Sequence, residues 1–257
     1  MNYDNPLFHL TDENIQQVRH IEELVSILSE NYYDTLFERK YDARLESIHA
    51  TVQLSNIPLS KSEIQTLYVE GALDFEDNYT EEALGVINAY KNAVYGYGKH
   101  NAYMLWLHDC MMNGISEYAG RYRRESFTCP LYDSINYTCS DYTEVPYRTA
   151  ELFEYILNTC ANPIIASLVF HIELLRISPF VDANDRIARL VSSMILDDYN
   201  DIFELIPLEV EILNNQATYR NAIKTSLIEG NDDAFISRML LILETGLTRT
   251  LNELKNS

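Results

Sequence analysis

The strongest constraint on the fold is the run PIIASLVFHIELLRI, from Pro163 to Ile177, whose apolar residues lie almost all the way round a helix. Asn162 and Pro163 provide the helix start, because Asn is a favoured N-cap and proline suits the first helical position. A helix that is apolar on nearly every side is normally buried at the centre of a domain. We therefore expect this segment to form the centre of the fold.

Most of the remaining chain is also expected to be helical, because apolar residues recur at three- and four-residue steps and only 8 glycines and 7 prolines interrupt them. Thr11 starts a periodic stretch that continues to about Gln53, and Ser60 with Glu63 forms a capping-box pattern for the next helix. A new segment starts at Pro207. Further helices are expected over residues 80–97, 101–113, 147–160, 216–227 and 233–247.

One region departs from the helical pattern. Between Glu125 and Val145, Phe, Thr, Tyr and Cys alternate with Pro, Asp, Ser and Asn. This composition favours a short β-hairpin or an extended flap over a helix.

The segment ISPFVDANDRIAR, from Ile177 to Arg189, has the features of a phosphate-binding loop. The central helix is expected to stop near Pro179 and a second helix to begin near Asn184, which aims the new N-terminal N–H groups at any anion in the loop. Arg186 and Arg189 lie three residues apart, on one face of that second helix, where they suit forked contacts with phosphate oxygens.

These residues strongly resemble the signature of the Fic (Fido) family, His-x-Phe-x-Asp/Glu-Gly/Ala-Asn-Gly/Lys-Arg-x-x-Arg. Two positions differ, since Ser178 stands where the family has its catalytic His and Asp185 where it has Gly or Lys. The matching residues are Phe180, Asp182, Ala183, Asn184, Arg186 and Arg189.

The resemblance runs from about Arg44 to Leu247 and is to the longer Fic proteins that carry an N-terminal inhibitory helix. It implies a mainly α fold, a Fic-type helical domain with a small β-hairpin flap and an added N-terminal helical segment. We assign residues 1–60 to the N-terminal segment and 61–257 to the Fic-like domain with core signature 178–189, together one compact unit.

The family's inhibitory motif is degenerate in this chain. In the family, Ser/Thr-x-x-x-Glu-Gly/Asn places a Glu against the last arginine of the signature and blocks productive ATP binding. The matching residues are Thr51, Ser55 in place of the Glu, and Asn56. The resemblance thus implies that Arg189 has lost its inhibitory partner.

The activity that the resemblance implies is transfer of AMP from ATP to a hydroxyl of a target protein, with ATP and Mg²⁺ as cofactors if the ancestral site is functional. By position, Asp182 would hold magnesium, Asn184 and the loop amides would meet the α-phosphate, and Arg186 and Arg189 the β- and γ-phosphates. Asp185 would also lie at the nucleotide. The target segment would be held by strand addition at a flap comprising Tyr142, Thr143, Glu144, Val145 and Pro146.

The serine at position 178 removes the expected general base. A hydroxyl takes no proton near neutral pH, so a catalytic factor of about 10² to 10⁴ is missing. His171 lies seven residues earlier, and at about 1.5 Å rise per residue its backbone is roughly 10 Å away, too far for an imidazole to replace the base. We interpret His171 as a structural residue, because it sits within an apolar run.

Asp185 places a carboxylate where phosphate should approach. At about 5 Å and an effective dielectric near 20, the repulsion costs about 3 kcal/mol. A Cβ in place of Gly also restricts close backbone approach. The alternative is that Asp185 swings outward or adds a second magnesium ligand beside Asp182.

The retained residues also have purely structural interpretations. Phe180 is a core residue at the base of the loop under either function, and Arg186 and Arg189 can pair with some of the 39 acidic side chains. Asp182 and Asn184 can be ordinary turn and N-cap residues.

Composition limits the partners. The net charge of −20 argues against nucleic acid and anionic membranes, which would repel the chain. The start of the chain lacks the basic and apolar runs of an export signal, so we expect a cytoplasmic protein. Four irregularly spaced cysteines suggest neither a zinc site nor a disulfide framework. The expected partner is an unknown target protein, and a homo-oligomer stays possible.

Two functions therefore stay open. The first is a Fic-type protein adenylyltransferase with altered and impaired chemistry. The second is a pseudoenzyme that retains the fold and binds a protein or a nucleotide, which fits the joint change of Ser178, Ser55 and Asp185. The sequence does not decide whether the chain is an enzyme.

Overall fold

The computed structural model describes residues 10–73, 78–93, 100–126, 128–130, 136–158, 160 and 162–256. The end of the helix expected over 80–97 and the centre of the expected hairpin lie outside these residues. The elements are α1 (Asp12–Glu38), α2 (Lys40–Leu54), α3 (Lys61–Glu70), α4 (Asn78–Asn92), α5 (Asn101–Met112), β1 (Thr128–Pro130), β2 (Asn136–Thr138), α6 (Val145–Asn158), α7 (Pro163–Ile177), α8 (Asn184–Tyr199), the 3-10 helix η2 (Asp201–Leu205), α9 (Leu208–Asn214), α10 (Gln216–Glu229) and α11 (Asp232–Lys255).

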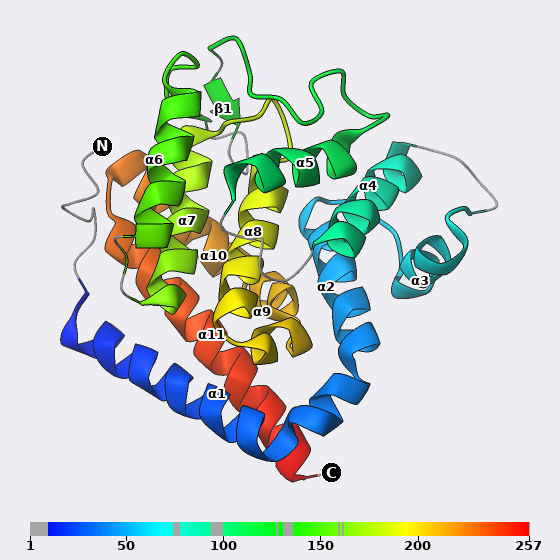
Figure 1. Ribbon diagram of the computed structural model, residues 1–257, viewed down its shortest axis with the longest axis vertical. Coiled ribbons are helices and arrows are strands. Elements are labelled where there is room, and N and C mark those ends of the chain that lie inside the picture. Colours follow the sequence, from blue (N-terminus) through cyan, green and yellow to red (C-terminus); the bar gives the residue numbers. More distant parts are fainter. Residues whose placement is uncertain are drawn as a thin grey trace.

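Apart from one small antiparallel hairpin at the edge of the molecule, the described elements are helices, which confirms the predicted fold class (Figure 1). Strands β1 and β2 pair with Cys129 opposite Tyr137, within the region where the sequence favours a hairpin. None of the helices in the described ranges is long and apolar enough to cross a membrane.

The helix α7 is the centre of the fold, as its apolar sequence predicts. All of its residues except Pro163 and Arg176 are buried, and Asn162 caps its first turn by accepting hydrogen bonds from the N–H groups of Ile164 and Ile165. Helix α8 is its most extensive neighbour, and α6, α10 and α11 also pack against it. The signature loop joins α7 to α8, so it is held between two buried helices.

The long N-terminal periodic stretch is two helices, α1 and α2. The chain leaves helical geometry at Arg39, whose N–H turns back to the carbonyl of Leu36 at 2.9 Å. Figure 1 shows the direction of the chain changing between α1 and α2. Helix α1 packs along α11 and α2 along α9, so the break lets one periodic sequence cover two different surfaces.

The N-terminal helices share the hydrophobic core of the rest of the chain. Ile21 and Leu28 of α1 and Ile48 and Val52 of α2 are fully buried in the same cluster as α7 and α8. The capping box expected before α3 is present, with reciprocal bonds between Ser60 and Glu63.

A buried ion-pair network joins α7 to α11. The guanidinium of Arg176 contacts Glu173 at 3.0 Å and also Asp232, and both carboxylates are nearly inaccessible to solvent. Burial raises the pKa of Glu173, although the charge of Arg176 opposes that shift. The positive charge of Arg176 therefore offsets the free-energy cost of burying the carboxylates of Glu173 and Asp232.

We predict that Arg176→Ala lowers the free energy of unfolding by about 3–5 kcal/mol, because it leaves two buried carboxylates without their cation. Lys61→Ala, which breaks an exposed pair with Glu46, is the control and should cost no more than about 1 kcal/mol. Urea denaturation of the two variants measures both values. Equal, small losses would show that the buried network does not hold α7 on α11.

Candidate functional site

A cavity of about 420 Å³ opens where α7 ends and α8 begins. The signature loop forms its floor, and the end of α2, the helix α4 and the hairpin contribute its walls. Among the residues lining it are Ser55, Asn56, Glu82, Cys129, Tyr137, Ser178, Asp182, Asn184, Asp185 and Arg186. It therefore unites residues that the sequence separates by up to about 130 positions.

Ser178 occupies the position where the family has its histidine, and its side chain is engaged by neighbours. It ends α7 in a left-handed conformation, with φ 45°, and is 1% exposed. Its hydroxyl donates to the carbonyl of Leu175 at 2.7 Å and lies 2.5 Å from the hydroxyl of Tyr137. Tyr137 also reaches the Leu175 carbonyl. The tyrosine of β2 thus closes over the serine.

Arg123 fixes the end of α7 from the opposite side. Its side chain is 2% exposed, and its Nε donates to the carbonyl of Ser178 at 2.7 Å. Other guanidinium donors reach the carbonyls of Ile177 and Ser140, while its backbone N–H donates to Pro179. A single side chain thereby satisfies carbonyl groups that the end of a helix leaves without partners.

His108 supports the base of the loop. Its ring stacks on Phe180, with centroids 3.7 Å apart. Its Nδ1 accepts from the N–H of Gly120 at 2.9 Å, so the proton lies on Nε2, which donates to the carbonyl of Asp182 at 3.3 Å. Burial lowers the pKa of His108 to about 4, so the ring is neutral at neutral pH. Phe180 is fully buried, as expected for the residue at the base of the loop.

The loop is closed by its own side chains. Asn184 bridges both backbone groups of Phe180, accepting from the N–H and donating to the carbonyl at 2.9 Å each. Asp182 accepts from the N–H of Ala183, which adopts a left-handed conformation with φ 61°. Ala183, and not Asn184, is the N-cap of α8. The amide of Asn184 therefore holds the loop closed instead of capping the helix.

Arg186 lies on the floor of the cavity between two carboxylates. Its guanidinium is 3.5 Å from Glu82 of α4 and 3.5 Å from Asp182. The arginine side chain is 6% exposed, whereas that of Asp182 is 65% exposed. The guanidinium of Arg186 is thus buried, whereas the carboxylate of Asp182 faces solvent.

Arg189 is fully buried and its partner is Asp185, one helical turn earlier, at 3.2 Å. Although burial raises the pKa of Asp185, the charges of Arg189 and Arg186 outweigh it and hold that pKa below its ordinary value. Asp185 therefore pairs with the guanidinium of Arg189 one turn later on the same helix. Three carboxylates face two guanidinium groups here, which leaves one net negative charge.

Of the three residues that resemble an inhibitory motif, Ser55 and Asn56 line the cavity and Thr51 does not. Ser55 ends α2 and its hydroxyl donates to the carbonyl of Thr51 at 3.0 Å, and Asn56 follows in a left-handed conformation with φ 59°. Thr51 is fully buried and bonds the hydroxyl of Tyr90 at 2.8 Å. Ser55 lines the site, but its short side chain is satisfied by its own helix.

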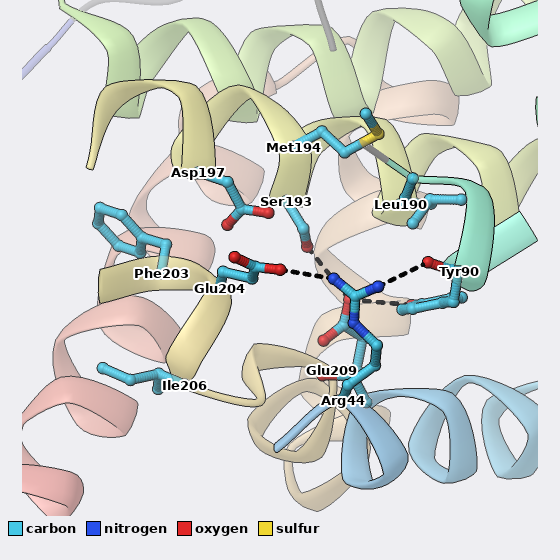
Figure 2. Close-up of a pocket in the computed structure, with 12 residues that line it drawn as sticks. Arg44, Tyr90, Leu190, Ser193, Met194, Asp197, Phe203, Glu204, Ile206 and Glu209 are labelled. Carbon is cyan, nitrogen blue, oxygen red and sulfur yellow. Dashed lines mark hydrogen bonds and ion pairs between the residues drawn. The ribbon is translucent and has the colours of Figure 1, made fainter. Parts of the chain in front are cut away.

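Tyr90 lines a second, smaller cavity of about 60 Å³, shown in Figure 2. There Tyr90 and Ser193 both donate to Glu209, at 3.0 and 3.1 Å. The guanidinium of Arg44 lies between the carboxylate of Glu204 and the backbone carbonyl of Tyr90. These bonds join α2, α4, α8 and α9, so Thr51 belongs to a structural network behind the signature helix.

The expected flap has a different conformation from an open strand. Residues 142–144 form a turn, and Val145 and Pro146 begin α6. The carboxylate of Asp141 accepts from the N–H and hydroxyl of Thr143 at 2.8 and 2.6 Å, which fixes this turn. Residues 142–146 therefore form no strand of their own, and target binding at this segment stays a prediction. The extended strands of the flap are β1 and β2.

His171 is a buried structural residue. Its Nε2 lies 2.9 Å from the hydroxyl of Tyr219, and its ring packs edge-on against Phe235. Burial lowers its pKa to about 3. It does not line the cavity, and none of the described residues that line it is a histidine.

Sequence reasoning missed His108, Arg123, Tyr137 and Glu82. The first two lie in LHDCMMNGISEYAGRYR, a stretch similar to the family, but only their contacts reveal that they support the loop. Tyr137 and Glu82 come from separate elements, and no local pattern connects either to the signature.

Residues 100–196 match the model of the Fic/DOC family. Among curated proteins no relative matches the chain.

Three solved structures share the fold. A Fic family protein from Desulfovibrio desulfuricans has a TM-score of 0.89 and 22% identity, covering 97% of this chain and 77% of that one. Fic-1 from C. elegans has a TM-score of 0.78 and 17% identity, with 95% and 73% covered. A Fic-domain-containing signaling protein from Bacteroides thetaiotaomicron has a TM-score of 0.71 and 16% identity, with 90% and 94% covered. These likenesses establish the fold.

The neutral, buried state of His108 predicts a pH dependence of stability. An unfolded histidine binds a proton below about pH 6.5, whereas folded His108 binds one only near its lowered pKa of about 4. Its contribution is therefore complete above pH 6.5 and is lost as pH falls from 6.5 to about 4. His108→Gln should reduce the slope of unfolding free energy against pH by up to about 1.4 kcal/mol per pH unit in this window. Denaturant titrations at several pH values measure it, and an unchanged slope would contradict the assignment.

Proposed function

Taking this chain as a member of the Fic/DOC family by its residues 100–196 and by its fold, we propose that it is related to protein adenylyltransferases and that its transfer reaction is impaired. The observation that carries the proposal is the state of Ser178, buried at the end of α7 beneath Tyr137. The family resemblance implies a histidine base at this position.

Within the part of the chain that the structure describes, no histidine lines the cavity to replace the missing base. A serine hydroxyl takes no proton from a target hydroxyl near neutral pH, which removes about 10²- to 10⁴-fold of catalysis. His171 is engaged with Tyr219, and His108 holds the loop through both ring nitrogens. Tyr137 moreover occupies space beside Ser178, so the site is closed where the base would act.

The phosphate-binding function is impaired by charge. Arg189 is buried against Asp185, and Arg186 lies between Glu82 and Asp182. A phosphate entering the loop would have to displace these carboxylates or tolerate their repulsion, about 3 kcal/mol for one unit charge at roughly 5 Å. Weak nucleotide binding follows from the arginines being already paired.

Magnesium fits the site only together with a nucleotide. The exposed carboxylate of Asp182 suits one Mg²⁺ ligand, and Mg²⁺ in such sites takes one or two carboxylates together with phosphate oxygens. Within the described residues, no group of three or more His, Cys, Asp or Glu side chains could hold a metal ion by itself. When bound, magnesium would neutralise phosphate charge, while Asp182 would orient it. ATP and Mg²⁺ are therefore cofactors only if the nucleotide enters.

A second candidate function is a pseudoenzyme that binds a protein partner at the same cavity and hairpin. It is favoured by the combination of a closed base position with paired arginines, since both features remove catalysis without removing the fold. In this case the cavity of about 420 Å³ accepts a side chain or a short segment of the partner. The bound partner is a protein, which includes a second copy of this chain.

The affinity for Mg-ATP, measured by calorimetry, tests the proposal in the natural chain and in two variants at one position. Asp185→Asn removes the charge and keeps the side-chain size, whereas Asp185→Gly also removes the Cβ. We expect weak or no binding in the natural chain and a gain of about a hundredfold in Asp185→Asn. Arg186→Ala in the Asp185→Asn background should abolish the gain. Circular dichroism checks that each variant folds.

AMP transfer is measured separately from nucleotide binding. Ser178→His combined with Tyr137→Phe and Asp185→Gly should show AMP transfer to itself or to a model protein, whereas the natural chain should show none. Tight Mg-ATP binding and transfer by the natural chain, both lost with Arg186→Ala, would contradict the proposal. No binding in any variant would leave the partner-binding function as the one supported.

A further inference from the structure

Two cysteines lie on one face of the hairpin beside the cavity. Cys129 is opposite Tyr137 in the register of β1 and β2, and Cys139 follows two residues after Tyr137. Side chains two residues apart on a strand point to the same face, and directly opposed residues share a face. Cys129, Tyr137 and Cys139 therefore project to the same side, toward Ser178 at the end of α7.

The two thiols interact with each other. A side-chain hydrogen bond joins Cys129 to Cys139, and Cys129 lies beside the hydroxyls of Ser178 and Tyr137. Cys129 is 2% exposed and lines the cavity, whereas Cys139 is half-buried. The pair thus has an inner sulfur and an outer sulfur that solvent can reach.

The surroundings favour a thiolate at the outer position. The hydrogen bond from Cys129 and the positive charge of Arg123 hold the pKa of Cys139 well below its ordinary value. The same bond raises the pKa of Cys129, so that cysteine keeps its proton and is the donor. Arg123 is fixed in this place by its bonds to the carbonyls of Ser140, Ile177 and Ser178.

The other two cysteines have the opposite environment. Burial raises the pKa of Cys110 on α5 and that of Cys160 after α6. Both are half-buried, as Cys139 is. Exposure alone therefore does not distinguish Cys139 from Cys110 and Cys160. The thiol of Cys129 and the charge of Arg123 do.

From this arrangement we propose that Cys129 and Cys139 form a site of reversible oxidation, in which a hydroperoxide converts the two thiols to a disulfide across the hairpin beside Ser178. Cys139 is the attacking sulfur and Cys129 the resolving sulfur. Reactive cysteines of this kind combine an electropositive, partly exposed setting with a neighbouring resolving thiol.

The reaction consumes one hydroperoxide. The Cys139 thiolate attacks one peroxide oxygen, a sulfur–oxygen bond forms, the oxygen–oxygen bond breaks, and hydroxide or alkoxide leaves and takes up a proton. The Cys129 sulfur then attacks the sulfenic acid, a sulfur–sulfur bond forms, and the hydroxyl leaves with the Cys129 proton as water. The two thiols lose two electrons, which the hydroperoxide gains.

Forming the bridge requires the backbone of the hairpin to move. Diagonal neighbours on one face of an antiparallel pair have Cα atoms about 7–8 Å apart with closer Cβ atoms, and a disulfide needs about 4.4–6.8 Å between Cα atoms. Because a hydrogen bond joins the two side chains, closure requires an inward shift of the backbone at Cys139, beyond the end of β2. The bridge would tie β1 to the segment after β2 and stiffen the wall of the cavity.

The test is peptide mapping of the full chain after treatment with hydrogen peroxide and blocking with N-ethylmaleimide. Cys129 and Cys139 lie together in the tryptic peptide 125–148, which contains no internal Lys or Arg. We expect this peptide to lose two hydrogen masses and to carry no maleimide, and a reducing agent to restore both thiols. Iodoacetamide at pH 6.5 should alkylate Cys139 at least about tenfold faster than Cys110.

Three variants separate the roles. Cys139→Ser should abolish peroxide reaction in this peptide, Cys129→Ser should accumulate a sulfenic acid at Cys139 that dimedone traps, and the matched control Cys110→Ser should behave as the natural chain. Because Cys129 is buried, Cys139→Ser carries the test if Cys129→Ser does not fold. Equal alkylation of Cys139 and Cys110, or a peptide 125–148 that keeps two free thiols under peroxide, would overturn the proposal.

Discussion

The junction between α7 and α8 depends on the guanidinium of Arg123. Helix α7 ends at a residue in a left-handed conformation and its last carbonyls need donors, which this buried side chain supplies at Ile177 and Ser178. His108 holds the next part of the loop at Asp182. Because α7 is the buried centre of the fold, these two side chains connect the core directly to the geometry of the site.

The framework of the candidate site is ordered, and its polar side chains are paired with one another. The loop closes on itself through Asn184, and Phe180 packs beneath it, as a phosphate-binding loop requires. Under the proposed function, the groups expected to act on a nucleotide have other partners, since Ser178 contacts Tyr137 and Arg189 pairs with Asp185. An ordered loop whose arginine and serine side chains already have partners is consistent with the proposed binding function rather than with group transfer.

The sequence could predict what depends on local patterns. The bounds of α7, the capping box at Ser60 and the position of the hairpin all follow from periodicity, capping residues and composition. The break at Arg39 could not be predicted, because apolar spacing continues through it and no Gly or Pro marks it. The pairing of Arg186 with Glu82 joins α8 to α4 across more than 100 residues, and such contacts leave no local signal. The pair of Asp185 with Arg189 was partly predictable. The spacing of four residues allows the ion pair, but only the structure shows that the Asp185 side chain points to Arg189.

The most direct test of the central claim is a nitrogen-15 NMR titration that follows the side-chain signals of Arg186 and Arg189 while Mg-ATP is added to the natural chain. If carboxylates already engage both guanidinium groups, their signals will not move at millimolar nucleotide, and Asp185→Asn will make the Arg189 signal responsive. Saturable shifts of both arginines in the natural chain at micromolar nucleotide would contradict the account, because they would show that the phosphate site is open.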